Sequence, residues 1–302
     1  MEVTDAAVTI SDTPTIAELN AIAAKTSGVV TATLAADSLG DLGALTTAGT
    51  DAITITVNDA DAAALTAADL STLGGKTSGT VTVTNAVAIT GDHDQVTAAL
   101  ITASTKVEVS DATVTINDAD ATAITASELS AIGGATTGAV TVTNAVAITG
   151  DHDQLTAALV TAGTLVDVSD ATVTINDADS TALNAEDLSA IGNKTTGTVT
   201  VTNAVAITGT TAQMIAALVT AGTLVEVSDA TVTISDIPTI AELNAIAAKT
   251  TGVVTATLAA NSLANLSDLT TAGTDAITIT VNDADAEALT CLLYTSPSPR
   301  DY

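Results

Sequence analysis

A fifteen-residue segment that recurs without change constrains this chain more than any other feature. The segment runs from Val81 to Gln95 and returns at positions 140–154, and its first eleven residues return once more at 199–209. Both start-to-start spacings are 59 residues. A fixed period of this length is typical of repeat architectures, in which each unit packs on its neighbours and not around one central core.

A longer period encloses the 59-residue units. Residues 2–66 return with few changes at 226–290, a shift of 224 residues. We therefore expect residues 1–290 to form one continuous repeat array, built from 59-residue units within a 224-residue superrepeat. We also expect this array to be a fragment of a larger one.

The last residues, 291–302, do not continue the pattern. They contain the only cysteine, the only arginine and both tyrosines of the chain. The stretch from Cys291 to Asp301 resembles a translated sequencing adapter. This resemblance implies that 291–302 is a non-native tail, and we leave it out of the fold prediction.

Each 59-residue unit divides into two related halves. One half begins Val-Thr-Val-Thr-Asn-Ala and the other begins Val-x-Val-Ser-Asp-Ala. Alternating β-branched residues predict a short strand, a turn at Asn-Ala or Asp-Ala, and a second short strand in each half. In the half that starts at Val107, we expect Val109, Val114 and Ile116 to face inward with it, and Glu108, Thr113 and Thr115 to face water.

Helical patterns follow the paired strands. After the first half, Val96, Ala99, Leu100 and Ala103 fall on one helical face, and Asp92 and Gln95 have capping-box spacing. In the copy that starts at Gln154, we expect Gly163 to stop the helix.

The helix of the second half is predicted at 125–132. Thr125 and Glu128 again have capping-box spacing, and Gly133 and Gly134 are expected to end it. Both kinds of helix are only two to three turns long, so they need packing against the strands to be stable.

These patterns predict an α/β fold, a right-handed solenoid of about eleven strand-turn-strand-helix coils with a parallel sheet. The handedness follows from the strong preference of strand–helix–strand crossovers. The alternative is a parallel β-helix, against which the helical stripes and capping boxes argue. A string of immunoglobulin-like sandwiches fits poorly, because such cores usually contain an aromatic residue and the body here has none.

The strand-plus-helix coil resembles a leucine-rich repeat, since Asn85, Asn144 and Asn203 lie near the position where that family keeps an asparagine. In composition and tandem repetition, residues 1–290 also resemble the large tandem-repeat surface or secreted, adhesin-like proteins of aquatic bacteria. This second resemblance implies a structural segment, a stalk or spacer, at the cell surface or outside the cell. The expected partners are then neighbouring repeats of the same parent protein.

Charge and residue content exclude several functions. The net charge of −29 disfavours nucleic acid, which needs a positive partner surface. The apolar runs, such as 215–219, are too short for membrane insertion. No catalytic constellation accompanies the two histidines, His93 and His152, so we expect neither an enzyme nor a cofactor.

Two acidic patterns are the only candidates for a metal site, and calcium is the ion they would suit. The first is Gly-Asp-His-Asp-Gln at 91–95 and 150–154, and the second is Asn-Asp-Ala-Asp at 117–120 and 176–179, with further copies that start at Asn58 and Asn282. We favour a helix N-cap for the first pattern and a polar turn for the second. The candidate ligands are Asp92, Asp94, Asp118, Asp120, Asp151, Asp153, Asp177 and Asp179.

Threonine dominates the outward strand positions, as at 54 and 56, 113 and 115, 172 and 174, and 231 and 233. Such positions favour strand pairing. The alternative function is a ligand-binding array for calcium, glycan or ice on the Asp-rich or Thr-rich faces, although Ala86 and Ala88 in the intervening coils are expected to break the threonine array. We finally expect end-to-end self-association, opposed by the net charge and promoted as salt screens it.

Overall fold

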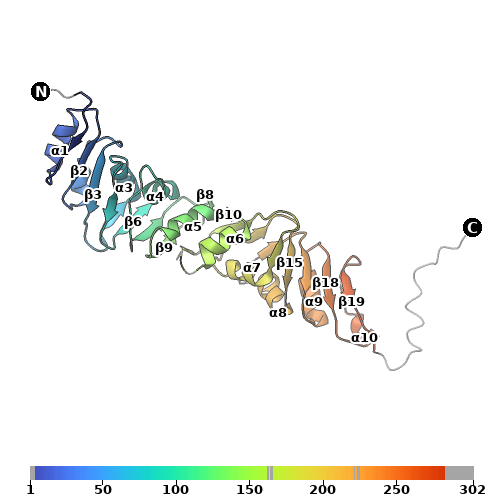
Figure 1. Cartoon of the computed structure of the whole chain (residues 1–302). Coiled ribbons are helices and arrows are strands. Elements are labelled where there is room, and N and C mark those ends of the chain that lie inside the picture. The colour runs from blue at the N-terminus through green and yellow to red at the C-terminus, as the bar shows by residue number, and fades with distance from the viewer. Residues whose placement is uncertain (1–3, 162, 164–165, 221, 223–224, 283–302) are drawn as a thin grey trace, which may run out of the picture.

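The computed structural model describes residues 4–161, 163, 166–220, 222 and 225–282. It is an elongated α/β solenoid whose first and last described coils lie at opposite ends (Figure 1). The predicted mixture of parallel strands and helices is confirmed. The tail at 291–302 and the acidic turn after Asn282 lie outside the described residues.

Every described strand is short. The strands are β1 (Val8–Thr9), β2 (Val30–Thr33), β3 (Ala52–Val57), β4 (Ala64–Thr66), β5 (Val81–Val83), β6 (Ala88–Gly91), β7 (Thr113–Ile116), β8 (Ala123–Thr125), β9 (Val140–Val142), β10 (Ala147–Gly150), β11 (Val166–Val168), β12 (Thr172–Ile175), β13 (Ala182–Asn184), β14 (Val199–Val201), β15 (Ala206–Gly209), β16 (Val225–Val227), β17 (Thr231–Ile234), β18 (Val254–Thr257) and β19 (Ala276–Thr278).

The helices are equally short, and neighbouring ones pack against each other along the solenoid. They are α1 (Ile16–Ala23), α2 (Leu39–Leu42), α3 (Ala67–Gly74), α4 (His93–Leu100), α5 (Ala126–Gly134), α6 (His152–Leu155), α7 (Ala185–Gly192), α8 (Thr211–Met214), α9 (Ile240–Ala247) and α10 (Leu263–Leu266). Two π-helical turns, η1 (Thr156–Val160) and η2 (Ile215–Val219), continue α6 and α8. Among the described residues, no helix is long and apolar enough to cross a bilayer.

The strands group into eleven coils, as predicted, but the coils are of more than one kind. The coil of β9 and β10 carries two strands, whereas the coil of β11, β12 and β13 carries three. All pairs are parallel, and they form four sheets with the orders β1-β2-β3-β5, β4-β6-β7-β9-β11, β8-β10-β12-β14-β16 and β13-β15-β17-β18-β19.

The three-strand coils shift the pairing sideways. The middle strand β12 pairs with β10, the second strand of the coil before it, and with β14, the first strand of the coil after it. The flanking strands β11 and β13 pair on one side only, with β9 and β15. Each 59-residue unit therefore moves the chain by one strand position, so that successive sheets are staggered along the solenoid.

One continuous hydrophobic core runs through the described coils from Leu19 to Leu258. It consists of aliphatic side chains, which suit the narrow space between the strands and the helices. In the coil predicted above, Val107, Val114 and Ile116 are buried, Val109 is half-buried, and Glu108 and Thr113 are exposed. The inward and outward faces of the strands are thus largely as the alternation predicts.

The predicted capping boxes are confirmed. The side chain of Asp92 accepts a hydrogen bond from the backbone N–H of Gln95, whose side chain accepts one from the N–H of Asp92. Thr125 and Glu128 make the same reciprocal pair at the start of α5.

The predicted helix ends were wrong in three places. Ala103 is exposed and lies outside α4, because the N–H and the hydroxyl of Thr102 both bond to the carbonyl of Thr97 and close the helix early. Gly133 and Gly134 lie within α5, which ends at the C-cap Ala135, since no glycine of the described chain has the positive φ of a helix stop. The helix of the next copy ends in η1 with the C-cap Thr161, before Gly163.

The cap of α5 gives a first stability prediction. Replacing Thr125 with alanine removes the hydroxyl that accepts from the N–H of Glu128 at 3.2 Å. We expect a loss of about 1 kcal/mol in the free energy of unfolding, the usual contribution of an N-cap. Urea unfolding followed by circular dichroism measures it. Ser130→Ala on the same helix takes no part in the cap and serves as the control, and an equal loss in both variants would contradict the prediction.

Candidate functional site

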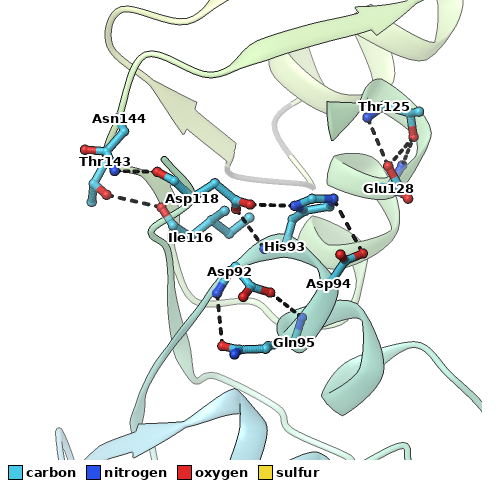
Figure 2. A network of polar contacts seen from close by, with 10 residues as sticks. All are labelled: Asp92, His93, Asp94, Gln95, Ile116, Asp118, Thr125, Glu128, Thr143 and Asn144. Atoms are coloured by element: carbon cyan, nitrogen blue, oxygen red, sulfur yellow. Dashed lines mark hydrogen bonds and ion pairs between the residues drawn. The ribbon is translucent and has the colours of Figure 1, made fainter. Parts of the chain in front are cut away.

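The acidic turn at 117–120 joins three consecutive coils. It lies between β7 and β8, and its first aspartate, Asp118, is only 6% exposed. Figure 2 shows the Asp118 side chain directed toward the start of α4, in the preceding coil. The two acidic patterns of the sequence therefore belong to one site.

Asp118 holds the first residue of α4 with both carboxylate oxygens. One oxygen accepts from the backbone N–H of His93 at 2.8 Å, and the other lies 2.7 Å from the imidazole Nδ1 of His93. The backbone N–H groups of a first helical turn have no partner within the helix, so a carboxylate here both satisfies a donor and complements the helix dipole. We call this arrangement the coil clasp.

The coil clasp recurs with the same geometry where the sequence repeats, and with different residues elsewhere. His152 and Asp177 repeat both contacts at 2.8 and 2.7 Å. In the third unit, Thr211 replaces the histidine, and its N–H and hydroxyl both donate to Asp236 at 2.6 and 2.7 Å. Near the N-terminal end, only the backbone contact exists, from Leu39 to Asp59 at 2.7 Å.

The rest of the turn joins it to the following coil. Asp120 accepts from the N–H of Ala145 at 3.2 Å, and the side chain of Asn144 donates to the carbonyl oxygen of Asp118. The residue after the second aspartate, Ala121, has a φ of 62°, which is unusual for a residue with a Cβ. Asn85 and Asn203 make the same contact as Asn144, to the carbonyls of Asp59 and Asp177.

The eight candidate metal ligands are dispersed among separate roles. Asp92 and Asp151 are helix N-caps, Asp118 and Asp177 form coil clasps, and Asp120 and Asp179 accept from the next turn. Asp94 and Asp153 are exposed, at 3.6 and 3.4 Å from Nε2 of His93 and His152. Among the residues that the structure describes, no group of three or more His, Cys, Asp or Glu side chains could hold a metal ion.

Sequence reasoning missed the histidine–aspartate contact, although a signal for it exists. The two residues are 25 apart in both copies, and the third unit replaces the histidine with Thr211, another side chain that can donate to a carboxylate. A covarying pair at one-coil spacing is what a contact between adjacent coils would leave in a tandem repeat.

The surroundings of His93 shift its titration. Burial disfavours the charged imidazole, but the hydrogen bond and negative charge of Asp118, together with the charges of Asp94 and Glu128, raise the pKa of His93 above 6.5 overall. For His152, the same balance of burial against Asp177, Asp153 and Asp151 also raises the pKa. At the adjacent cap, the hydrogen bonds from Thr125 lower the pKa of Glu128.

A pH dependence of stability follows from these shifts. Because the folded-state pKa of His93 and His152 is above the unfolded value of 6.5, their stabilisation is complete below that pH and is lost as the pH rises through the folded-state pKa. We expect the urea midpoint to fall between about pH 5.5 and about pH 8.5. The control is a variant with His93→Thr and His152→Thr, which copies the natural Thr211 clasp and should lose most of this dependence. An unchanged pH profile in that variant would show that other groups cause it.

Threonine ladders form a second regular surface feature. Thr66, Thr90, Thr115 and Thr141 are in register across β4, β6, β7 and β9, and the series continues to Asp167 on β11. The next sheet repeats it with Thr125, Thr149, Thr174, Thr200 and then Glu226. The break expected at Ala88 affects only the neighbouring column, where Ala88 lies between Ala64 and Thr113.

Comparison with known proteins identifies no relative. No protein-family model matches the chain, and no curated protein and no solved structure is significantly similar to it.

Proposed function

We propose that the chain is a structural repeat segment, a stalk or spacer of a large bacterial cell-surface or secreted adhesin-like protein. The observation that carries the proposal is the use of the acidic side chains. In the coil clasps and the turns beside them, the conspicuous polar groups join one coil to the next. A spacer needs this kind of continuity along its length, and it needs no ligand pocket.

The proposed setting is extracellular or at the cell surface, with neighbouring repeats of the same parent protein as partners and no enzymatic activity. The charge of −29 supports it, because like-charged copies repel one another and remain dispersed. The absence of cysteine from the body leaves no disulfide to maintain in an oxidising environment.

A second candidate function is a ligand-binding array, and the threonine ladders favour it. Exposed Thr66, Thr90 and Thr141 present hydroxyl and methyl groups at the spacing of neighbouring parallel strands, about 4.8 Å. A regular row of this kind suits an ordered lattice such as ice, or a glycan. Calcium is less well served, because the carboxylates of Asp118 and Asp177 already accept hydrogen bonds from the protein.

Two measurements on the full chain separate the candidates. A spacer is expected to scatter X-rays as a rod, and its melting temperature should be the same with and without calcium. Ice-recrystallisation assays with the chain and with its Thr90→Val, Thr115→Val, Thr141→Val variant test the ladder. A calcium-dependent rise in melting temperature, or an ice effect that the variant loses, would replace the spacer with the binding array.

A further inference from the structure

The superrepeat gives each terminal coil an internal copy, against which its burial can be compared. β1 corresponds to β17, 224 residues later. Val232 and Ile234 of β17 are 0% and 5% exposed, whereas Val8 and Ile10 at the same positions near the N-terminus are only partly buried. The first coil thus has apolar side chains that a neighbouring coil covers in the second copy.

The other end of the described solenoid shows the same contrast. Ile55 and Val57 on β3 are 0% exposed, but their counterparts Ile279 and Val281 are 43% and 38% exposed. In the helix and loop of this coil, Leu42 and Leu45 are 0% exposed, while Leu266 and Leu269, at the same positions, are only partly buried. Within the described part of the chain, β1 pairs only with β2 and β19 only with β18.

The chain also shows which strand covers the exposed edge of β1. The matching edge of β17 pairs with β15, with Ala206 opposite Thr231, Ile207 opposite Val232 and Thr208 opposite Thr233. The sequence of β15 begins Ala-Ile-Thr, and β19 has the same three residues, Ala276 to Thr278. The last strand of the described solenoid therefore carries the side chains that the first strand accepts in the internal copy.

We propose that the chain assembles head to tail, with β19 of one molecule pairing in parallel with β1 of a second copy. Ala276 is opposite Ala7, Ile277 opposite Val8 and Thr278 opposite Thr9, in the register of β15 and β17. The inference goes beyond the proposed function, because a spacer within one chain needs no contact with a second molecule. The two edges differ, so the contact does not close on itself and adds copies in a line.

Electrostatic repulsion opposes this assembly. Asp5 and Asp12 lie beside the first strand and Asp268 and Asp275 beside the last, in a chain with a net charge of −29. Screening by salt weakens repulsion between exposed charges, whereas apolar contacts do not weaken with salt. Association should therefore be stronger in about 1 M salt than in about 0.05 M salt, where the screening length is several times greater.

The test uses the full chain and measures molar mass by light scattering as a function of protein concentration at both salt concentrations. Val8→Lys blocks the first edge and Ile277→Lys blocks the last. Each variant alone should remain monomeric in high salt, and an equimolar mixture should stop at a dimer, because each molecule keeps one intact edge. Val253→Lys changes an apolar side chain, 38% exposed, away from both edges, and should associate like the parent chain.

A backbone variant covers the case in which a lysine disturbs the fold. The N–H groups of Val8 and Ile10 bond to β2, so the N–H of Thr9 points to the opposite, outer edge. Thr9→Pro removes that outward donor and leaves the bonds to β2 in place, and it should also prevent growth from the first edge. The proposal fails if the parent chain stays monomeric in high salt, if the mixture forms no dimer, or if Val253→Lys suppresses association equally.

Discussion

Replacing Gly138 with alanine is expected to cost about 3 kcal/mol or more in the free energy of unfolding, the upper range for side chains forced into a packed interior. A Cβ at this position would lie 2.3 Å from the carbonyl oxygen of Ala112 in the preceding coil. The same carbonyl accepts the hydroxyl of Thr136, which in turn accepts from the N–H of Gly138. The added methyl group therefore separates two coils and breaks a buried hydrogen-bonded turn.

A matched control lies four residues earlier. Gly134 ends α5 with a helical φ, and a methyl group added there would have nothing within 4 Å of it. Gly134→Ala should therefore stabilise the chain by roughly 0.5–1 kcal/mol through its higher helix propensity. Urea unfolding compares the two variants. Similar stabilities would mean that the coils can move apart at the Gly138 turn without loss.

The second large effect is expected at the coil clasp. Asp118→Ala leaves the backbone N–H of His93 and its imidazole without their carboxylate. Hydrogen bonds to charged groups contribute about 1.5–3 kcal/mol each, so we expect a total loss of about 3 kcal/mol. Asp120→Ala, in the same turn, removes one exposed contact to Ala145 at 3.2 Å and should cost about 1 kcal/mol.

A double-mutant cycle separates the side-chain contact from the helix cap. With His93→Ala as the second change, the coupling to Asp118→Ala should be at least about 1 kcal/mol, as for residues in one hydrogen-bonded network. His93→Thr should retain most of the stability, because Thr211 makes the equivalent contact with Asp236. Additive losses in the cycle would show that Asp118 acts only on the backbone of α4.

Local patterns predicted the elements of this fold well. The strand faces around Val114 and the capping box of Thr125 and Glu128 depend on residues a few positions apart, so the sequence is sufficient to find them. The early end of α4 was missed because Thr102 competes for the carbonyl of Thr97, an effect that apolar periodicity does not register.

Contacts between coils were beyond such reasoning. The clasp of His93 with Asp118 and the shared pairing of β12 with β10 and β14 both depend on which residues the stacking brings together. The coil length varies along the chain, so a period of 59 residues does not fix that stacking. The acidic residues were correctly located as turn and cap positions, but their partners in the adjacent coils required the structure.

The stagger of the four sheets has a mechanical consequence. Between the coil of β9 and β10 and the coil of β11 to β13, two different sheets cross the junction, through the pairs β9–β11 and β10–β12. At the next junction, the crossing pairs are β12–β14 and β13–β15, which belong to one of those sheets and to a new one. The arrangement resembles overlapping courses of brick, in which no seam runs straight through the wall. A pulling force along the rod therefore meets a sheet that bridges each of these junctions, and the coils share the tension instead of separating at the border between units.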